Sequence, residues 1–185
     1  MSMLERPEGR TLAHRRLLVA AALIAACGTS LAQERPRFGQ PATAEEILPW
    51  DITAEPDGDG LPAGSGTVRQ GAAVYAAQCR SCHGENGTGG PAARLAGVQG
   101  TIGAKTARVR TIGTFWPYAT TVFNYVFTAM PFQNTKSLTH DETYAVTAYL
   151  LYLNGIIGQD EVMDAVTLPK VKMPNRDYFV MHVTE

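Results

Sequence analysis

The sequence predicts a mainly α-helical domain, because helical signals are strong and strand signals are sparse. Two capping boxes, Thr67-x-x-Gln70 and Thr139-x-x-Glu142, each precede a segment whose apolar residues recur at helical spacing. Strict alternation of apolar and polar residues, the pattern of a half-buried strand, is rare along the chain. We therefore expect one helical domain with irregular segments before and after it.

The first helix is expected to begin after Thr67. One face of it is formed by residues spaced four, three and four apart, namely Val68, Ala72, Tyr75 and Cys79. Gly71 lies inside this helix, where a glycine costs about 1 kcal/mol relative to alanine. A close contact with another helix would compensate for that cost, so the sequence predicts such a contact at Gly71.

Two further helices are expected. A loop rich in glycine, proline and threonine separates the first helix from a shorter one at 119–129, which ends at Met130. The last helix runs from Thr139 to Asn154, and Gly155 stops it. This helix is apolar on two faces, which indicates that it is buried between two neighbouring elements.

Residues 1–32 have the layout of a secretory signal peptide. Arginines precede an apolar run that is too short for a comfortable transmembrane helix, and Ser30-Leu31-Ala32 provides a signal-peptidase site. The segment Ile24-Ala25-Ala26-Cys27 also resembles a bacterial lipobox, in which Cys27 would carry a lipid. We favour cleavage after Ala32, and both alternatives predict export to the periplasm.

The remaining irregular segments set the limits of the domain. Residues 33–65 are rich in proline and glycine and lack periodicity, which predicts an extended arm. Residues 159–185 are irregular and interrupted by prolines, which predicts a C-terminal tail. The domain itself is therefore expected at 66–158.

The composition excludes several classes of protein. With 185 residues, 45% hydrophobic and 18% charged, the chain is not a collagen, a disordered acidic tail or a polytopic membrane protein. Its 16 Lys and Arg residues nearly balance its 17 Asp and Glu residues, so nothing indicates a nucleic-acid partner. Three cysteines are too few for a disulfide scaffold.

The chemistry is carried by the motif Cys79-Arg80-Ser81-Cys82-His83. C-x-x-C-H is the attachment signature of c-type haem. Cysteines three residues apart on a helical turn face the same way, so each sulfur can form a thioether with one vinyl group. His83 follows directly and can offer its imidazole to the iron from the same side. We therefore expect one covalently bound haem c.

A zinc site and a redox dithiol are the alternatives for the two cysteines. Zinc needs four ligands, and after residue 32 the chain offers only His140 and His182 besides the motif. A thioredoxin-like dithiol belongs in a βαβ pattern, which the sequence lacks. The export signal and the helix leading into the motif favour haem.

Met130 is the expected second axial ligand of the iron. It lies between the haem motif and the last helix, followed by Pro131, where a loop can cross the other face of the ring. The other candidates after residue 32 are Met163, Met173, Met181, His140 and His182. Met173 is also followed by a proline, but it lies well beyond the last helix, and a methionine is more often a core residue than a ligand.

This order of features resembles the class I cytochromes c. In that family a glycine and an aromatic residue of the first helix meet an aromatic residue of the last, and Gly71, Tyr75 and Tyr149 match those places. The resemblance implies that Pro91 supplies the carbonyl that holds the second nitrogen of the haem histidine. It also implies that Leu95 packs on the ring.

A closer resemblance covers most of the chain after residue 32. Five segments resemble the cytochrome subunit of Sox-type sulfite or sulfane dehydrogenases: Trp50-Asp51-Ile52, Gly60-Leu61-Pro62-x-Gly64-Ser65-Gly66, Trp116-Pro117-Tyr118-Ala119-Thr120-Thr121, Ala129-Met130-Pro131-Phe132 and Leu168-Pro169-Lys170-Val171-Lys172-Met173-Pro174-Asn175-Arg176. The resemblance implies that Trp116 and Tyr118 lie near the haem propionates. Those subunits carry two haems, whereas this chain has one C-x-x-C-H motif, so it resembles their first haem domain.

The resemblance implies an electron carrier rather than an enzyme. Such a protein would accept single electrons from a molybdenum-cofactor sulfite or sulfane dehydrogenase subunit. It would pass them to a downstream cytochrome or oxidase of the respiratory chain. Two other classes of protein remain open. One is the haem subunit of another dehydrogenase, for example an alcohol dehydrogenase. The other is a haem enzyme or gas sensor in which the sixth coordination position of the iron is vacant.

Overall fold

The structure is a computed structural model, and it describes residues 39–47, 50–51, 53–97 and 109–179. The chain divides into two units, Met1–Ala42 and Thr43–Glu185. The described residues of the first unit, 39–42, form neither helix nor strand. The predicted signal peptide lies outside the described residues.

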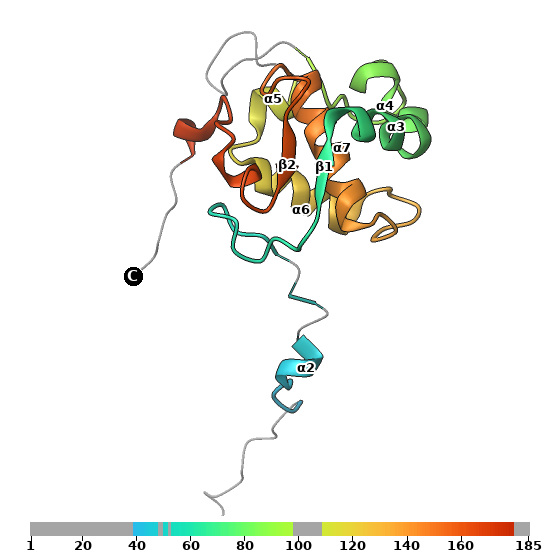
Figure 1. Ribbon diagram of the computed structural model, residues 1–185. Coiled ribbons are helices and arrows are strands. Elements are labelled where there is room, and N and C mark those ends of the chain that lie inside the picture. The colour runs from blue at the N-terminus through green and yellow to red at the C-terminus, as the bar shows by residue number, and fades with distance from the viewer. Residues whose placement is uncertain (1–38, 48–49, 52, 98–108, 180–185) are drawn as a thin grey trace, which may run out of the picture. The chain divides into compact units, whose positions relative to one another are not determined.

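The second unit is built mainly of helices (Figure 1). Its elements are α2 (Ala44–Ile47), β1 (Ser65–Thr67), α3 (Val68–Gln78), α4 (Arg80–His83), η1 (Glu85–Gly87), α5 (Ile112–Phe115), α6 (Ala119–Ala129), α7 (His140–Leu153), β2 (Val162–Asp164), η2 (Leu168–Lys170) and η3 (Arg176–Tyr178), where η marks a 3-10 turn. The mainly α-helical fold class is therefore confirmed. Of the helices in the described ranges, none has the length and apolarity needed to span a membrane.

Both predicted capping boxes form. Before α3, Thr67 Oγ1 accepts a hydrogen bond from the Gln70 N–H at 3.2 Å, and the Thr67 N–H donates to Gln70 Oε1 at 2.9 Å. Thr139 and Glu142 make the same pair of bonds before α7, at 3.2 and 2.8 Å. Gly155, with a φ of 64°, follows the end of α7 as expected. The predicted start of α3 and the predicted bounds of α6 and α7 are thus confirmed to within a residue.

Helix α7 forms the centre of the core. Six of its residues are 0% exposed, namely Thr143, Tyr144, Val146, Thr147, Ala148 and Leu151. Helix α3 packs against one side of α7 and α6 packs against another (Figure 1). The two apolar faces of α7 predict that this helix is buried between two neighbouring elements, and the arrangement confirms it.

Helices α3 and α7 approach each other closely at Gly71. A Cβ atom at this position would overlap the carbonyl oxygen of Ala145 and lie 2.8 Å from Tyr149 Cβ. Beside this contact, the ring centroids of Tyr75 and Tyr149 are 5.3 Å apart. The close helix contact predicted at Gly71 is confirmed, because only a residue without a side chain allows this crossing.

The C-terminal tail contributes to the core and is more ordered than its sequence indicates. Strand β2 pairs antiparallel with β1, with Met163 opposite Gly66. Met163, Leu168 and Met173 are 2%, 0% and 4% exposed. Sequence periodicity misses β2 because three residues are too few to show an alternating pattern. The packed structure therefore continues beyond residue 158.

The arm also contains more than extended chain. Helix α2 is a single turn, which begins where the Thr43 N–H donates to the Glu46 carboxylate at 2.9 Å. Farther along, the backbone of Ala54 exchanges two hydrogen bonds with the side-chain amide of Asn124, at 2.9 and 2.7 Å. Because Asn124 belongs to α6, this pair attaches the arm to that helix.

Candidate functional site

Cys79 and Cys82 lie where α3 ends and α4 begins. The Cys79 N–H donates to the Tyr75 carbonyl at 2.9 Å, and the His83 N–H donates to the Cys79 carbonyl at 3.0 Å. Both thiols are free. Burial, and to a smaller extent the neighbouring Cys82, raises the pKa of the Cys79 thiol to about 11. At neutral pH the cysteine next to the core is therefore a protonated thiol, and a helical turn holds both cysteines with His83.

The ring of His83 is held by a backbone carbonyl. Its Nδ1 lies 2.6 Å from the carbonyl oxygen of Ala93. A carbonyl oxygen can only accept a hydrogen bond, so Nδ1 carries the proton. In a neutral imidazole the free lone pair then lies on Nε2, which is the atom left to bind a metal ion. The ring is thus held in the tautomer that an axial ligand requires.

The carbonyl partner of His83 belongs to Ala93 and not to Pro91, so the assignment of Pro91 is wrong by two residues. The reason lies in how the loop meets α4. The Ala92 N–H donates to the Cys82 carbonyl at 2.8 Å, and a Cβ atom on Gly90 would overlap that same carbonyl oxygen. Pro91 is therefore fixed beside Cys82, and the carbonyl that reaches the ring comes later in the chain.

Leu95 lies in the same loop, as the family resemblance implies. Its N–H donates to the Gly87 carbonyl at 2.8 Å. Its side chain packs against the core and is only partly buried. Contact of this side chain with a haem ring stays a prediction.

Met130 is the C-cap of α6. Its backbone is extended, with φ −124° and ψ 150°, and its N–H donates to the Val126 carbonyl at 3.1 Å. The side chain is partly exposed, and Phe132, two residues later, is 82% exposed. The end of the helix therefore presents a thioether that the core does not enclose.

The structure does not bring Trp116 and Tyr118 into one cavity. Trp116 lines a groove of about 380 Å³ together with Tyr125, and the two ring centroids are 5.6 Å apart. Tyr118 lines a separate cavity of about 570 Å³, where the Arg176 guanidinium lies 4.3 Å from the centre of its ring. Their predicted place near haem propionates stays a prediction for both residues.

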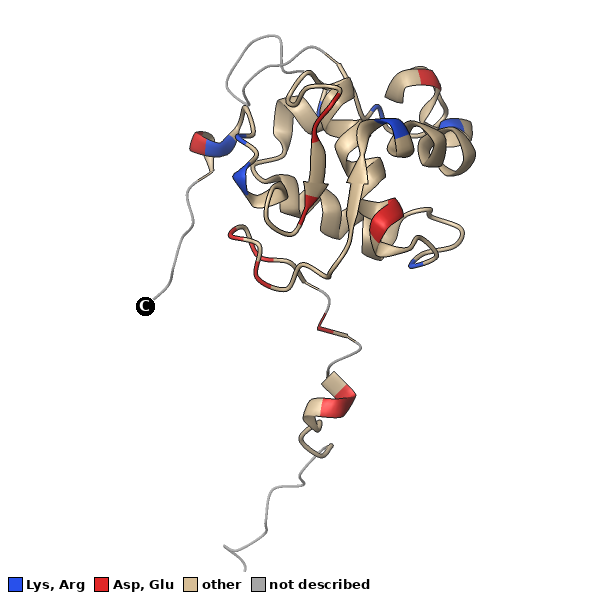
Figure 2. Ribbon diagram, in the orientation of Figure 1, with Lys and Arg blue, Asp and Glu red and all other residues tan. Residues whose placement is uncertain are grey.

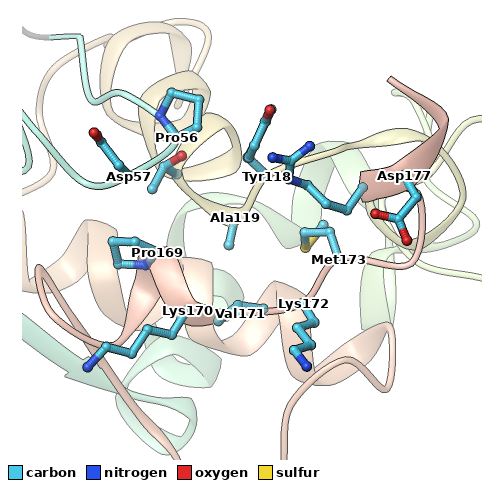
Figure 3. Close-up of a pocket in the computed structure, with 12 residues that line it drawn as sticks. Pro56, Asp57, Tyr118, Ala119, Pro169, Lys170, Val171, Lys172, Met173 and Asp177 are labelled. Atoms are coloured by element: carbon cyan, nitrogen blue, oxygen red, sulfur yellow. The ribbon is translucent and has the colours of Figure 1, made fainter. Parts of the chain in front are cut away.

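The cavity around Tyr118 also contains the rival methionine. Met173 lines its wall between Lys172 and the beginning of α6 (Figure 3). Met173 is 4% exposed, and none of the C-x-x-C-H residues lines this cavity. The tail residues that line this cavity are of both charges, Lys170, Lys172 and Arg176 with Asp177, and Figure 2 shows the blue and red segments of the tail. Met173 therefore behaves as a core residue of the tail, whereas Met130 is open to a partner.

The residues of the site fit a haem group. Cys79, Leu95, Trp116 and Phe127 pack against the core and remain partly exposed. Apolar side chains in this state are suited to cover a flat apolar group. The donors are a histidine Nε2, a thioether and two free thiols, which suit a thioether-linked iron porphyrin. Within the described ranges, no three His, Cys, Asp or Glu side chains are grouped to hold a bare metal ion.

The helical fold, the capped α3 and α7 that cross at Gly71, and the C-x-x-C-H turn define a c-type cytochrome. Residues 66–150 match the family model described as cytochrome c oxidase, cbb3-type, subunit III. A chain in the crystal structure of the sulfane dehydrogenase SoxCD from Paracoccus pantotrophus is similar to this one, with 41% sequence identity and a TM-score of 0.70. The match covers 79% of this chain and 72% of that chain. No curated protein matches the sequence. The chain belongs to the class I c-type cytochromes and resembles a haem domain of Sox-type dehydrogenases.

Sequence reasoning missed two residues that shape the loop beside His83. Ala93 acts through its backbone carbonyl, so its side chain gives no signal. Asn154 donates from Nδ2 to the Leu95 carbonyl at 3.1 Å. A polar residue at the end of an otherwise apolar helix was the available signal, since it must find buried partners.

Proposed function

We propose that this protein is an exported, mono-haem electron carrier. Cys79 and Cys82 bind one haem c through thioethers, and His83 and Met130 are the axial ligands of the iron. The observation that carries the proposal is the bond from His83 Nδ1 to Ala93, because it frees Nε2 beside two unbridged thiols. The signal peptide predicted at 1–32 supports a periplasmic location.

When bound, the haem supplies a one-electron Fe(III)/Fe(II) couple. The chain's residues control that couple and need no acid, base or nucleophile. The neutral thioether of Met130 favours the ferrous state and so raises the reduction potential. The proton on His83 Nδ1 works in the opposite direction, because sharing it with a carbonyl makes the imidazole more electron-rich. Apolar side chains such as Leu95 and Trp116 exclude water, which disfavours the extra charge of the ferric state.

The electron donor is a molybdenum-cofactor sulfite or sulfane dehydrogenase subunit. The 41% identity to a chain of a sulfane dehydrogenase over most of both chains supports this proposal. A downstream cytochrome or oxidase then accepts the electron. Contacts between redox partners are small and short-lived, which suits a carrier that meets both in turn.

The first experiment measures the intact mass and the pyridine haemochrome spectrum of the exported protein. We expect one haem per chain and no free thiol. A protein that retains both thiols and carries no haem would falsify the proposal.

The second experiment tests the donor. The purified cytochrome is mixed with a molybdenum sulfite dehydrogenase, and the haem absorbance is followed after sulfite is added. We expect catalytic reduction that depends on the dehydrogenase. Reduction by an alcohol dehydrogenase instead would assign the protein to another dehydrogenase, and rapid carbon monoxide binding to the reduced protein would indicate an open-site haem protein.

A further inference from the structure

The loop that supplies the Ala93 carbonyl is fixed at both ends. At one end, the Ala92 N–H donates to the Cys82 carbonyl at 2.8 Å. At the other end, the Leu95 N–H donates to the Gly87 carbonyl at 2.8 Å. Ala93 lies between these two points, so the position of its carbonyl depends on how firmly each end is held.

The Leu95 end has two further attachments, one from α5 and one from the end of α7. The carbonyl of Leu95 accepts two hydrogen bonds, one from the Ile112 N–H and one from Asn154 Nδ2, both at 3.1 Å. Asn154 is the C-cap of α7 and is 2% exposed. Its Nδ2 also donates to the carbonyl of Leu150 at 2.8 Å, which fixes the amide plane. The core helix and the loop beside His83 are therefore joined by one side-chain amide.

The C-terminal tail holds this amide from the other side. Asn154 Oδ1 accepts from the Gly113 N–H at 3.1 Å, and the Gly113 carbonyl accepts from Asn175 Nδ2 at 3.1 Å. A Cβ atom on Gly113 would lie 2.9 Å from Asn154 Oδ1, so this contact needs glycine. Asn175 belongs to the tail and is 0% exposed. The bonds thus run from the tail through Gly113 and Asn154 to Leu95.

We propose that Asn154 is a positioning residue for the axial histidine and that Asn175 of the tail supports it. Asn154 acts through the Leu95 carbonyl to fix the loop that presents the Ala93 carbonyl to His83 Nδ1. This inference rests on the proposed function, since it concerns the tuning of a haem bound at His83. When Asn154 is replaced, the Leu95 carbonyl keeps only the Ile112 N–H as a donor, so this end of the loop loses one of its hydrogen bonds and its tie to α7.

The direction of the effect follows from the bond between His83 and Ala93. A short bond from Nδ1–H to a carbonyl makes the imidazole a stronger donor to iron and favours the ferric state. When the loop loosens, that bond weakens and the ferric state is favoured less. Loss of the Asn154 bond to Leu95 therefore raises the reduction potential.

The test uses Asn154→Ser in the haem-loaded protein. A serine hydroxyl can still bond the carbonyl four residues earlier, that of Leu150, but it cannot reach Leu95. We expect a higher reduction potential and an exchange of the His83 Nδ1 proton with solvent, measured by NMR, that is about tenfold faster. Asn175→Ala should shift both quantities in the same direction by less.

The control is Leu168→Ala, which removes a 0% exposed tail side chain without touching these hydrogen bonds. It should lower stability and leave the potential and the His83 proton exchange unchanged. A potential and an exchange rate in Asn154→Ser equal to the wild-type values would overturn the inference. If that variant does not fold, wild-type values in Asn175→Ala overturn it. The haemochrome spectrum of each variant shows whether haem is bound. A failure of the proposed function, seen as absence of haem, is therefore distinguished from a failure of this inference.

Discussion

Met130 and Met173 are each followed by proline, but their surroundings differ. Met130 caps α6 with a partly exposed side chain, whereas Met173 is 4% exposed among residues of the tail. We therefore expect Met130→Ala to lose the methionine–iron charge-transfer band of the ferric protein. Met173→Ala should retain the band and lose about 2–4 kcal/mol of stability, because it leaves a cavity in the core. The near-infrared spectrum and a denaturant titration of each variant measure the two effects.

The opposite pattern would show that the tail supplies the ligand. In that case Met173→Ala would lose the band and bind carbon monoxide in the reduced state, and Met130→Ala would keep a wild-type spectrum. The matched pair separates ligation from packing, since both substitutions remove the same side chain.

Residues whose side chains carry the chemistry could be predicted from sequence. The spacing of Cys79, Cys82 and His83 is the spacing of a haem-attachment motif, and the structure places them on one helical turn. The carbonyl of Ala93 could not be predicted in the same way, because every residue has a carbonyl and only the path of the loop selects one. The misassigned Pro91 shows this limit, since the order of features was right and the backbone path was unknown.

At the level of elements, the crossing of α3 and α7 depends on Gly71. Gly71→Ala puts a Cβ atom into the Ala145 carbonyl and against Tyr149, so the two helices must separate. Overpacking of this kind costs about 3 kcal/mol in the free energy of unfolding, and more when backbone must move. Denaturant unfolding measured by circular dichroism checks the value.

Gly97→Ala is the matched control for that substitution. Gly97 is exposed, and a Cβ atom there would meet Thr111 Cγ2 at 3.4 Å and Arg94 Cδ at 3.8 Å, which are ordinary contacts with side chains. We expect a change within about 0.5 kcal/mol of the wild type, as for most surface substitutions. Equal effects of the two variants would mean that the helix crossing does not need glycine.

The long helices were predictable because their ends carry local signals. The side chains of Thr67 and Thr139 bind their own helix starts, so sequence alone contains the information. Strands β1 and β2 were not predictable, since each has three residues and their pairing joins segments far apart in the chain. Short elements held by distant partners leave little trace in local sequence.

At the scale of the whole molecule, the tail after α7 is part of the folded unit. Removal of the chain from residue 168 onward would delete Leu168 and Met173 from the core and Asn175 from its buried bond to Gly113. We expect a loss of more than about 5 kcal/mol, because each of the two apolar deletions alone costs about 2–5 kcal/mol. We expect that neither this truncated chain nor a chain ending at residue 158 unfolds cooperatively.

Thermal unfolding followed by circular dichroism measures this loss. A chain that lacks only residues 180–185 is the control, because it retains Leu168, Met173 and Asn175. If the chain that ends at residue 167 unfolded cooperatively with the wild-type midpoint temperature, the tail would only cover the surface.

The buried tyrosines give the molecule an upper pH limit. Burial raises the pKa of Tyr75 and of Tyr144 from 10.0 to about 12 each, and their hydroxyls donate at 2.8 Å to the carbonyls of Gly84 and Pro62. The folded state therefore holds these protons more tightly than the unfolded state does. Their contribution to the free energy of unfolding is fully present below pH 10 and is lost as the pH rises from about 10 to 12, at about 1 kcal/mol per pH unit for each tyrosine.

Urea unfolding across this pH range measures the effect. The wild type should show that slope, and Tyr75→Phe and Tyr144→Phe should each show a shallower one. The exposed control Tyr178→Phe should show the wild-type slope. A slope that neither buried variant changes would place the alkaline limit elsewhere in the molecule.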